Sequence, residues 1–193
     1  MGDHFQTLVD LDASPQDAPR LAERVVAWLV AEGLVQAELL PDCVYGLPLG
    51  RMPGPNWHRA VAPQDVRFGP GEGLAVHTER TVFHGGQGTL EAVHCPRCAA
   101  TTRLHDGRNM VPETWGPFLL AVDTWYETGA ADVDCPTCAE RVPLPDWTWH
   151  DDYFAFAHLG FQLWNWPPLT TEFRTRITGL LDGHRTTYLQ GKL

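Results

Sequence analysis

Lysine and serine are almost absent from this chain of 193 residues, and each absence argues against a class of enzyme. The one lysine, Lys192, is followed only by Leu193, so it cannot serve a phosphate-binding loop that opens a helix, and a buried Schiff-base lysine is disfavoured too. The one serine, Ser14, belongs to no G-x-S-x-G motif, which excludes a typical serine hydrolase. Since the residues of most enzyme motifs are missing, a non-catalytic protein is the leading hypothesis.

Long apolar runs are missing as well. The longest one, Val25 to Ala31, is too short to cross a bilayer. The first residues lack the basic and apolar blocks of a signal peptide, so we expect a cytoplasmic protein that does not enter a membrane. Thiols stay reduced in that compartment, so the five cysteines are expected to be metal ligands or free thiols. Arginine greatly outnumbers lysine, which is typical of a high-GC bacterial genome.

Basic residues are few relative to acidic ones, with 14 Lys+Arg against 24 Asp+Glu and a formal net charge of −10. No run of basic residues exists, and an acidic surface repels phosphate backbones, so nucleic-acid binding is disfavoured. An acidic protein is attracted to basic partners instead. We therefore expect a protein partner, while its identity and the oligomeric state have no signal in the sequence.

The pattern of apolar residues predicts an α+β fold in a single domain over 1–193. Strand 4–12, helix 15–32 capped by Ser14 and a short strand at 43–45 give an N-terminal β-α-β unit. A long Pro/Gly-rich loop over 46–73 follows. Further strands are expected over 74–77 and 81–84, joined by a tight turn at 78–80, and over 89–94 and 185–189. Helices are expected over 112–128 and 170–182, the second joining the last strand on the same sheet.

Two cysteine pairs carry the strongest chemical signal. The sequences Cys95-Pro96-Arg97-Cys98 and Cys135-Pro136-Thr137-Cys138 each place two sulfurs on one tight turn, which proline makes rigid. Two such turns close a tetrahedral four-thiolate site with no ligand position left over, which is the usual form of a structural zinc site. We therefore predict one structural zinc ion bound by Cys95, Cys98, Cys135 and Cys138, with rubredoxin-like iron or a redox disulfide pair as alternatives.

These pairs resemble the two Cys-Pro-x-Cys knuckles of a zinc ribbon, and the resemblance covers residues 89–144. Two features differ from the usual pattern. Ala99 and Ala139 stand where a glycine commonly follows the second cysteine of a knuckle, and the segment between the knuckles contains the helix expected over 112–128. The resemblance implies a ribbon that is embedded in the larger domain and pins this helix to it.

The whole chain is also similar to a group of small bacterial proteins of uncharacterised function. The residues behind this similarity are the two knuckles, the stretch Trp164-Asn165-Trp166-Pro167-Pro168 and the ending Gly191-Lys192-Leu193. Some members of the group carry the label sugar ABC transporter ATPase. That label implies a phosphate-binding loop, which this sequence does not contain, so no function is transferred from it.

Other polar residues have a structural and a functional interpretation. His94 either hydrogen-bonds a nearby sulfur at a strand end or competes as a ligand, and Cys43 is either a buried thiol or a nucleophile beside His58, His77 or His84. His150-Asp151-Asp152 either caps a helix through Phe154, Phe161 and Trp164 or moves protons. The tryptophans between Trp147 and Trp166 form either a dense core or a binding face.

Three hypotheses for the function follow. The first is a non-catalytic, zinc-stabilised adaptor or immunity-type inhibitor that binds a basic partner protein. The second is an enzyme or small-molecule binder that uses loop 46–73, the His150-Asp151-Asp152 cluster and the tryptophans. The third is a zinc ribbon that binds nucleic acid, which would require Arg97, Arg103 and Arg108 on one exposed face.

Overall fold

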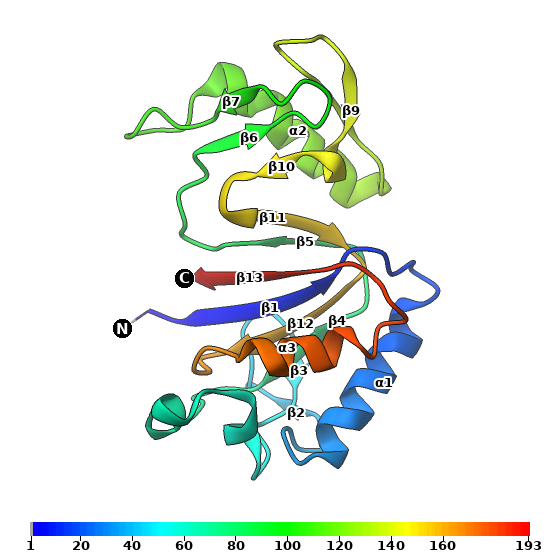
Figure 1. The fold of residues 1–193 in the computed structure, drawn as a ribbon, viewed down its shortest axis with the longest axis vertical. Coiled ribbons are helices and arrows are strands. Elements are labelled where there is room, and N and C mark those ends of the chain that lie inside the picture. Colours follow the sequence, from blue (N-terminus) through cyan, green and yellow to red (C-terminus); the bar gives the residue numbers. More distant parts are fainter. Residues whose placement is uncertain (1) are drawn as a thin grey trace.

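Four antiparallel strands form the largest sheet of the structure, a computed structural model that describes residues 2–193. Their order is β13 (Thr186–Lys192), β1 (His4–Asp10), β12 (Leu159–Trp164) and β4 (Leu74–His77). Figure 1 shows β1 and β13, the first and last strands in the sequence, side by side. The protein is thus a mixed α and β fold, and the final strand joins the N-terminal one as expected, although it extends to Lys192 rather than to Leu189.

Strand β1 is buried from Phe5 to Asp10 because it has a neighbouring strand on each side and is covered on both faces. Two of its three buried polar side chains, Gln6 and Asp10, have hydrogen-bond partners, whereas the hydroxyl of Thr7 has none among residues 2–193. The side-chain amide of Gln6 donates to the carbonyls of Trp166 and Pro167 at 2.9 and 3.0 Å, and its oxygen accepts the amide of Leu169 at 2.9 Å. This one residue therefore ties the turn before α3 (Thr171–Thr178) to the centre of the sheet.

Helices α1 (Ala18–Ala31) and α3 pack on one face of this sheet. Their shared core consists of aliphatic and aromatic side chains that include Leu21, Val25, Phe161, Phe173 and Ile177. Helix α1 begins one turn later than predicted, because the Ser14 hydroxyl accepts the amide of Asp17 and closes a separate turn first. Helix α3 likewise ends at Thr178, with turns rather than helix over residues 179–182.

The predicted β-α-β unit is wrong. Residues 43–45 form no strand; the neighbouring segments β2 (Leu40–Pro41) and β3 (Leu49–Gly50) pair with each other as a two-residue ladder. Asp42, at φ +56°, interrupts the extended backbone between them. The partners of β1 come from the C-terminal third of the chain and are antiparallel to it. Loop 46–73 also contains β3 and two short 3₁₀ helices, Trp57–Ala60 and Pro63–Phe68.

A two-stranded ribbon leaves this sheet toward the other half of the molecule. Strand β4 continues into β5 (Thr81–His84), and β11 (Phe154–Ala157) continues into β12. The predicted bounds of β4 and β5 are confirmed, but the two do not form a hairpin: β4 pairs with β12, and β5 pairs with β11. Residues 78–80 are therefore a bend in a ribbon that connects two lobes (Figure 1).

We call residues 85–153 the cysteine lobe and the remainder the sheet lobe. Helix α2 (Pro112–Thr128) has the predicted bounds, and Gly129 ends it at φ +87°. The strand predicted over 89–94 is shorter than expected. The strands here are all short: β6 (Ala92–His94), β7 (Thr101–Arg103), β8 (Asp132–Asp134), β9 (Arg141–Pro143) and β10 (Thr148–Trp149). They form a β10-β6-β7 sheet and a separate β8-β9 hairpin.

The helix predicted after His150 is not formed, which corrects the capping interpretation of the His150-Asp151-Asp152 cluster. These three residues form a short 3₁₀ turn in which Asp151 and Asp152 have φ values of +53° and +49°. Strands β11 and β12 follow in place of a helix. A second 3₁₀ turn, Leu144–Asp146, lies before β10.

The tryptophan-rich segment belongs to the core, which confirms the structural interpretation. Trp147 and Trp149 pack around Phe118 in the cysteine lobe, with ring centroids 4.9 and 5.6 Å from it. Trp164 packs against Phe5 in the sheet lobe. Asn165, at φ +54°, turns the chain directly after β12, between Trp164 and Trp166 and before helix α3.

Candidate metal centre

The four predicted cysteine ligands come together in one cluster. Their sulfur atoms all lie within 4.8 Å of one another, with 4.0 Å between Cys95 and Cys138 and 3.8 Å between Cys98 and Cys135. A tetrahedral ion with metal–sulfur bonds of about 2.3 Å separates its ligands by roughly 3.8 Å, whereas a disulfide needs about 2.05 Å. The donor set and spacing therefore fit a single tetrahedral metal ion. Within residues 2–193 no other cluster of three or more His, Cys, Asp or Glu side chains fits a metal.

Each cysteine pair lies in the turn of a hairpin, and the two turns are built alike. Cys95 stands between β6 and β7, and its amide donates to the carbonyl of Ala100 at 3.0 Å while its carbonyl accepts from Ala99. The second knuckle repeats both bonds between β8 and β9, at 2.9 Å each. The amide of Arg97 also approaches the Cys95 sulfur at 3.4 Å. The duplicated sequence thus produces a duplicated structure.

Ala99 and Ala139 occupy the strained position of each knuckle. Their φ angles are +59° and +60°, in the left-handed region where a side chain is unfavourable and glycine is preferred. Alanine in place of the common glycine therefore keeps the same backbone conformation, but at a cost in conformational energy. Two strained residues beside the ligands persist because the surrounding hairpins hold them.

The environment of the cluster favours the thiolate form of one ligand, Cys135. The backbone amide of Cys138 lowers the pKa of the Cys135 thiol to about 6, because hydrogen bonding stabilises the charged sulfur. Cys95 and Cys135 are buried, Cys98 is exposed and Cys138 is intermediate. One side of the cluster therefore faces solvent, which gives an ion a path to the site.

The other sequence candidates stay outside this cluster. His94 bonds the hydroxyl of Thr101 at 3.0 Å across the β6–β7 pair, rather than a sulfur as expected. The buried thiol of Cys43 donates to the carbonyl of Leu40 at 3.3 Å, and within residues 2–193 no histidine hydrogen-bonds it. Loop 46–73 belongs to the sheet lobe and the His150-Asp151-Asp152 turn to the cysteine lobe, so the structure does not bring them together.

The outer face of α2 exposes large apolar residues to solvent. Leu119, Leu120 and Tyr126 are 45%, 69% and 61% exposed. Phe118, Ala121 and Trp125 are the buried residues of this helix. The pattern could not separate the two sets, because apolar residues occupy more of the helix circumference than one buried face needs.

Acidic side chains share this face with the apolar residues. Glu113, Asp123 and Glu127 are exposed on the same outer face of α2 at helical spacing. We call this face, with Leu119, Leu120 and Tyr126, the α2 surface. The arginines that nucleic-acid binding would need are exposed but dispersed, since Arg97 and Arg108 border different surface hollows.

No family model, curated protein or solved structure matches the chain. The likeness to a zinc ribbon therefore rests on the geometry of the four cysteines. No helix among residues 2–193 combines the length and apolar character that a bilayer crossing requires.

Proposed function

We propose that this protein is a non-catalytic adaptor or immunity-type inhibitor whose cysteine lobe presents the α2 surface to a basic protein partner. The α2 surface is the observation that carries the proposal. Exposed leucines and a tyrosine interleaved with carboxylates are typical of a surface that binds another protein. A partner helix or loop with apolar and basic side chains is the matching chemistry.

Zinc has a structural part in this proposal. The four thiolates of Cys95, Cys98, Cys135 and Cys138 would hold it, and the ion would supply folding free energy rather than a reaction centre. Zn²⁺ with four thiolates carries a formal charge of about −2, which makes the acidic lobe more attractive to a basic partner.

Helix α2 is held near both of its ends. The hydroxyl of Thr114 in its first turn donates to the carbonyl of Arg103 in β7, at the end of the first knuckle's hairpin, at 2.7 Å. Arg80, at the bend of the ribbon, donates to the carbonyls of Tyr126 and Glu127 at 3.2 and 2.8 Å. The cluster and the ribbon together therefore fix the direction in which the α2 surface points.

Photo-crosslinking in the native host tests this proposal. A photoreactive amino acid at position 120 is expected to crosslink a basic protein, whereas the same residue at the exposed position Glu172 on α3 should not. Asp123→Lys is expected to abolish the crosslink, since it places like charges at the interface, and Glu38→Lys makes the same change in charge on the sheet lobe as a control. Equal crosslinking from both positions, or none from position 120, would contradict the proposal.

A further inference from the structure

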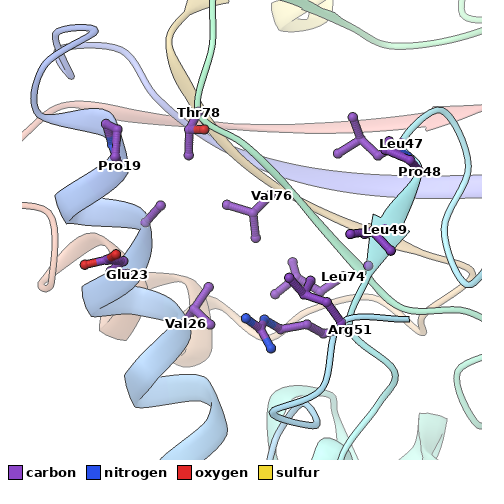
Figure 2. A pocket seen from close by; sticks show the side chains of 13 residues that line it. Pro19, Glu23, Val26, Leu47, Pro48, Leu49, Arg51, Leu74, Val76 and Thr78 are labelled. Carbon is purple, nitrogen blue, oxygen red and sulfur yellow. The ribbon is translucent and has the colours of Figure 1, made fainter. Parts of the chain in front are cut away.

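A cleft of about 460 Å³ lies in the sheet lobe, between α1, β4 and the segment 47–51. This volume is within the range of about 300–1,000 Å³ that is typical of ligand sites. Figure 2 shows Val26 of α1 and Val76 of β4 facing the same space, with Leu49 on the opposite wall. The lining is mostly apolar, and Leu39 and Leu49 are exposed at its rim. The cleft is therefore an apolar groove along one strand.

That strand, β4, is the edge of the four-stranded sheet, and part of its edge has no partner. Leu74 exchanges both backbone hydrogen bonds with Arg51, at 2.8 and 3.0 Å, so its N–H and C=O point away from β12. Backbone groups of alternate residues point to the same side of a strand, so those of Val76 point to this edge too. In the part of the chain that the structure describes, nothing pairs with them there, because β3 turns away to pair with β2.

Two charged side chains border the groove on opposite walls. Figure 2 shows the guanidinium of Arg51 extending across the lower end of the cleft and Glu23 standing on α1. Arg51 donates from Nη1 to the carbonyl of Ala37, and neither Arg51 nor Glu23 belongs to any ion pair formed within residues 2–193. The remaining donors of a guanidinium fit a carboxylate in a bidentate manner.

The location of Arg51 also limits what can lie in the groove. A chain that pairs with Val76 cannot continue past Leu74, because the backbone of Arg51 already occupies that edge. A strand that runs antiparallel to β4 would therefore have to end at Arg51, with its terminal carboxylate beside the guanidinium. Its alternate side chains would rest on Leu74, Val76 and Val26.

We propose that this groove binds the extended C-terminal segment of another protein as an additional antiparallel strand beside β4, with the terminal carboxylate held by Arg51. Backbone pairing to Val76 supplies affinity, and the apolar walls select apolar side chains at the last and third-last positions. Glu23 favours a basic residue upstream. The site lies in the sheet lobe and does not depend on the α2 surface, so either proposal can fail alone.

Selection from random hexapeptides displayed with free C-termini is the first test, on the full-length zinc-loaded protein. Enrichment of peptides with apolar last and third-last residues is expected, while the same library displayed with blocked C-termini should be enriched much less. Absence of enrichment would overturn the proposal. The best peptide is then synthesised as a free acid and as an amide for anisotropy titration. The amide should bind roughly tenfold more weakly, because it loses the charge-assisted bond.

Substitutions locate the site. Arg51→Gln is expected to weaken the free acid roughly tenfold and leave the amide unaffected, whereas Arg108→Gln should change neither. Equal loss for acid and amide would contradict the role of the carboxylate. Thermal unfolding of each variant shows that it is folded, and the comparison of acid with amide on the unsubstituted protein needs no variant at all.

Val76→Pro tests the backbone pairing directly. Proline removes only the N–H at this edge, which is the place in a sheet where it is tolerated, and Val76→Ala removes a similar part of the side chain but keeps the N–H. Binding should be lost in the proline variant and largely kept in the alanine variant. Displacement of the peptide from the unsubstituted protein by octanoate, together with equal binding of octanoate to both variants, would indicate a fatty-acid site. Concentration-dependent dimers in sedimentation would indicate a second copy, and either result overturns the proposal.

Discussion

The two lobes reach a folded state by different means. The sheet lobe pairs strands of up to seven residues that come from opposite ends of the chain. The strands of the cysteine lobe have two or three residues each. Short two-stranded pairs are marginal by themselves, so the cysteine lobe needs another source of stability. The two short hairpins of this lobe instead bring four sulfur atoms within 4.8 Å of one another, so a bound metal ion would link what backbone pairing leaves separate.

The cores of the two lobes also differ in the type of side chain that fills them. Aliphatic side chains from α1, α3 and the sheet fill most of the sheet-lobe core. In the cysteine lobe, aromatic rings pack edge to face, as between Phe118 and Trp147 with centroids 4.9 Å apart. These few large rings and the cysteine cluster leave the lobe with little redundancy. Loss of the cluster should therefore affect the two lobes unequally.

The largest expected effect comes from removing one thiolate. Cys135→Ser should abolish the binding of one zinc per chain and destabilise the cysteine lobe by several kcal/mol, since metal-binding energy there is folding energy. Elemental analysis and amide hydrogen exchange check this: the amides of α2 should lose protection while those of β1 keep it. The control is Cys43→Ser, which should retain one zinc per chain. Uniform loss of protection in both lobes would mean that the metal supports the whole chain.

A substitution in β1 should have the opposite effect: it should destabilise the sheet lobe and leave the metal site intact. Gln6→Ala removes a buried side chain that bonds Trp166, Pro167 and Leu169, and should cost the sheet lobe about 3 kcal/mol, since buried partners are left unsatisfied. Zinc content should stay unchanged. Denaturant unfolding checks the loss, and the exposed Gln190→Ala serves as the control. A loss of zinc in the Gln6 variant would show that the lobes are not separable.

The next largest effect is a pH dependence of the sheet lobe's stability, which comes from His77. Burial lowers the pKa of His77, so the unfolded chain binds a proton more readily than the folded one. Stability of the sheet lobe should therefore fall as the pH drops below about 6.5, the ordinary value for histidine, and continue to fall until the pH reaches the lowered pKa. His77→Gln should flatten this dependence, measured by urea unfolding with a β1 amide probe. Identical pH profiles for both proteins would contradict the prediction.

The smallest effect concerns the knuckles. Ala99→Gly should stabilise the cysteine lobe by roughly 0.5–1 kcal/mol, because glycine adopts the left-handed conformation without steric cost. Ala27→Gly, the same change at an exposed site in α1, should destabilise by about as much. Thermal unfolding of the zinc-loaded variants gives both values. A destabilising effect at Ala99 would show that the alanine methyl makes a contact worth more than the strain.

The sequence alone predicts the elements whose ends are marked by particular residues. Pro112 and Gly129 bounded α2, and the paired spacing of the cysteines located their cluster. The segment from Phe154 to Trp164 was misread as helical, because a nearly continuous apolar run has no distinct period and only tertiary pairing with β4 and β5 makes it extended. The groove beside β4 had no signal in the sequence, since Arg51 and Val76 meet only through long-range pairing.

The ribbon between the lobes has a consequence for how such a gene can change. His84 is paired with Phe154, so the chain leaves the sheet lobe and re-enters it at one place. Deleting residues 85–153 and joining these ends by a short turn would leave β5 and β11 as an ordinary hairpin. The cysteine lobe is therefore an insertion at one place in the strand order of the sheet, and a segment that replaced it by recombination would have to cover Val82, Phe154 and Phe156, which now pack against its core.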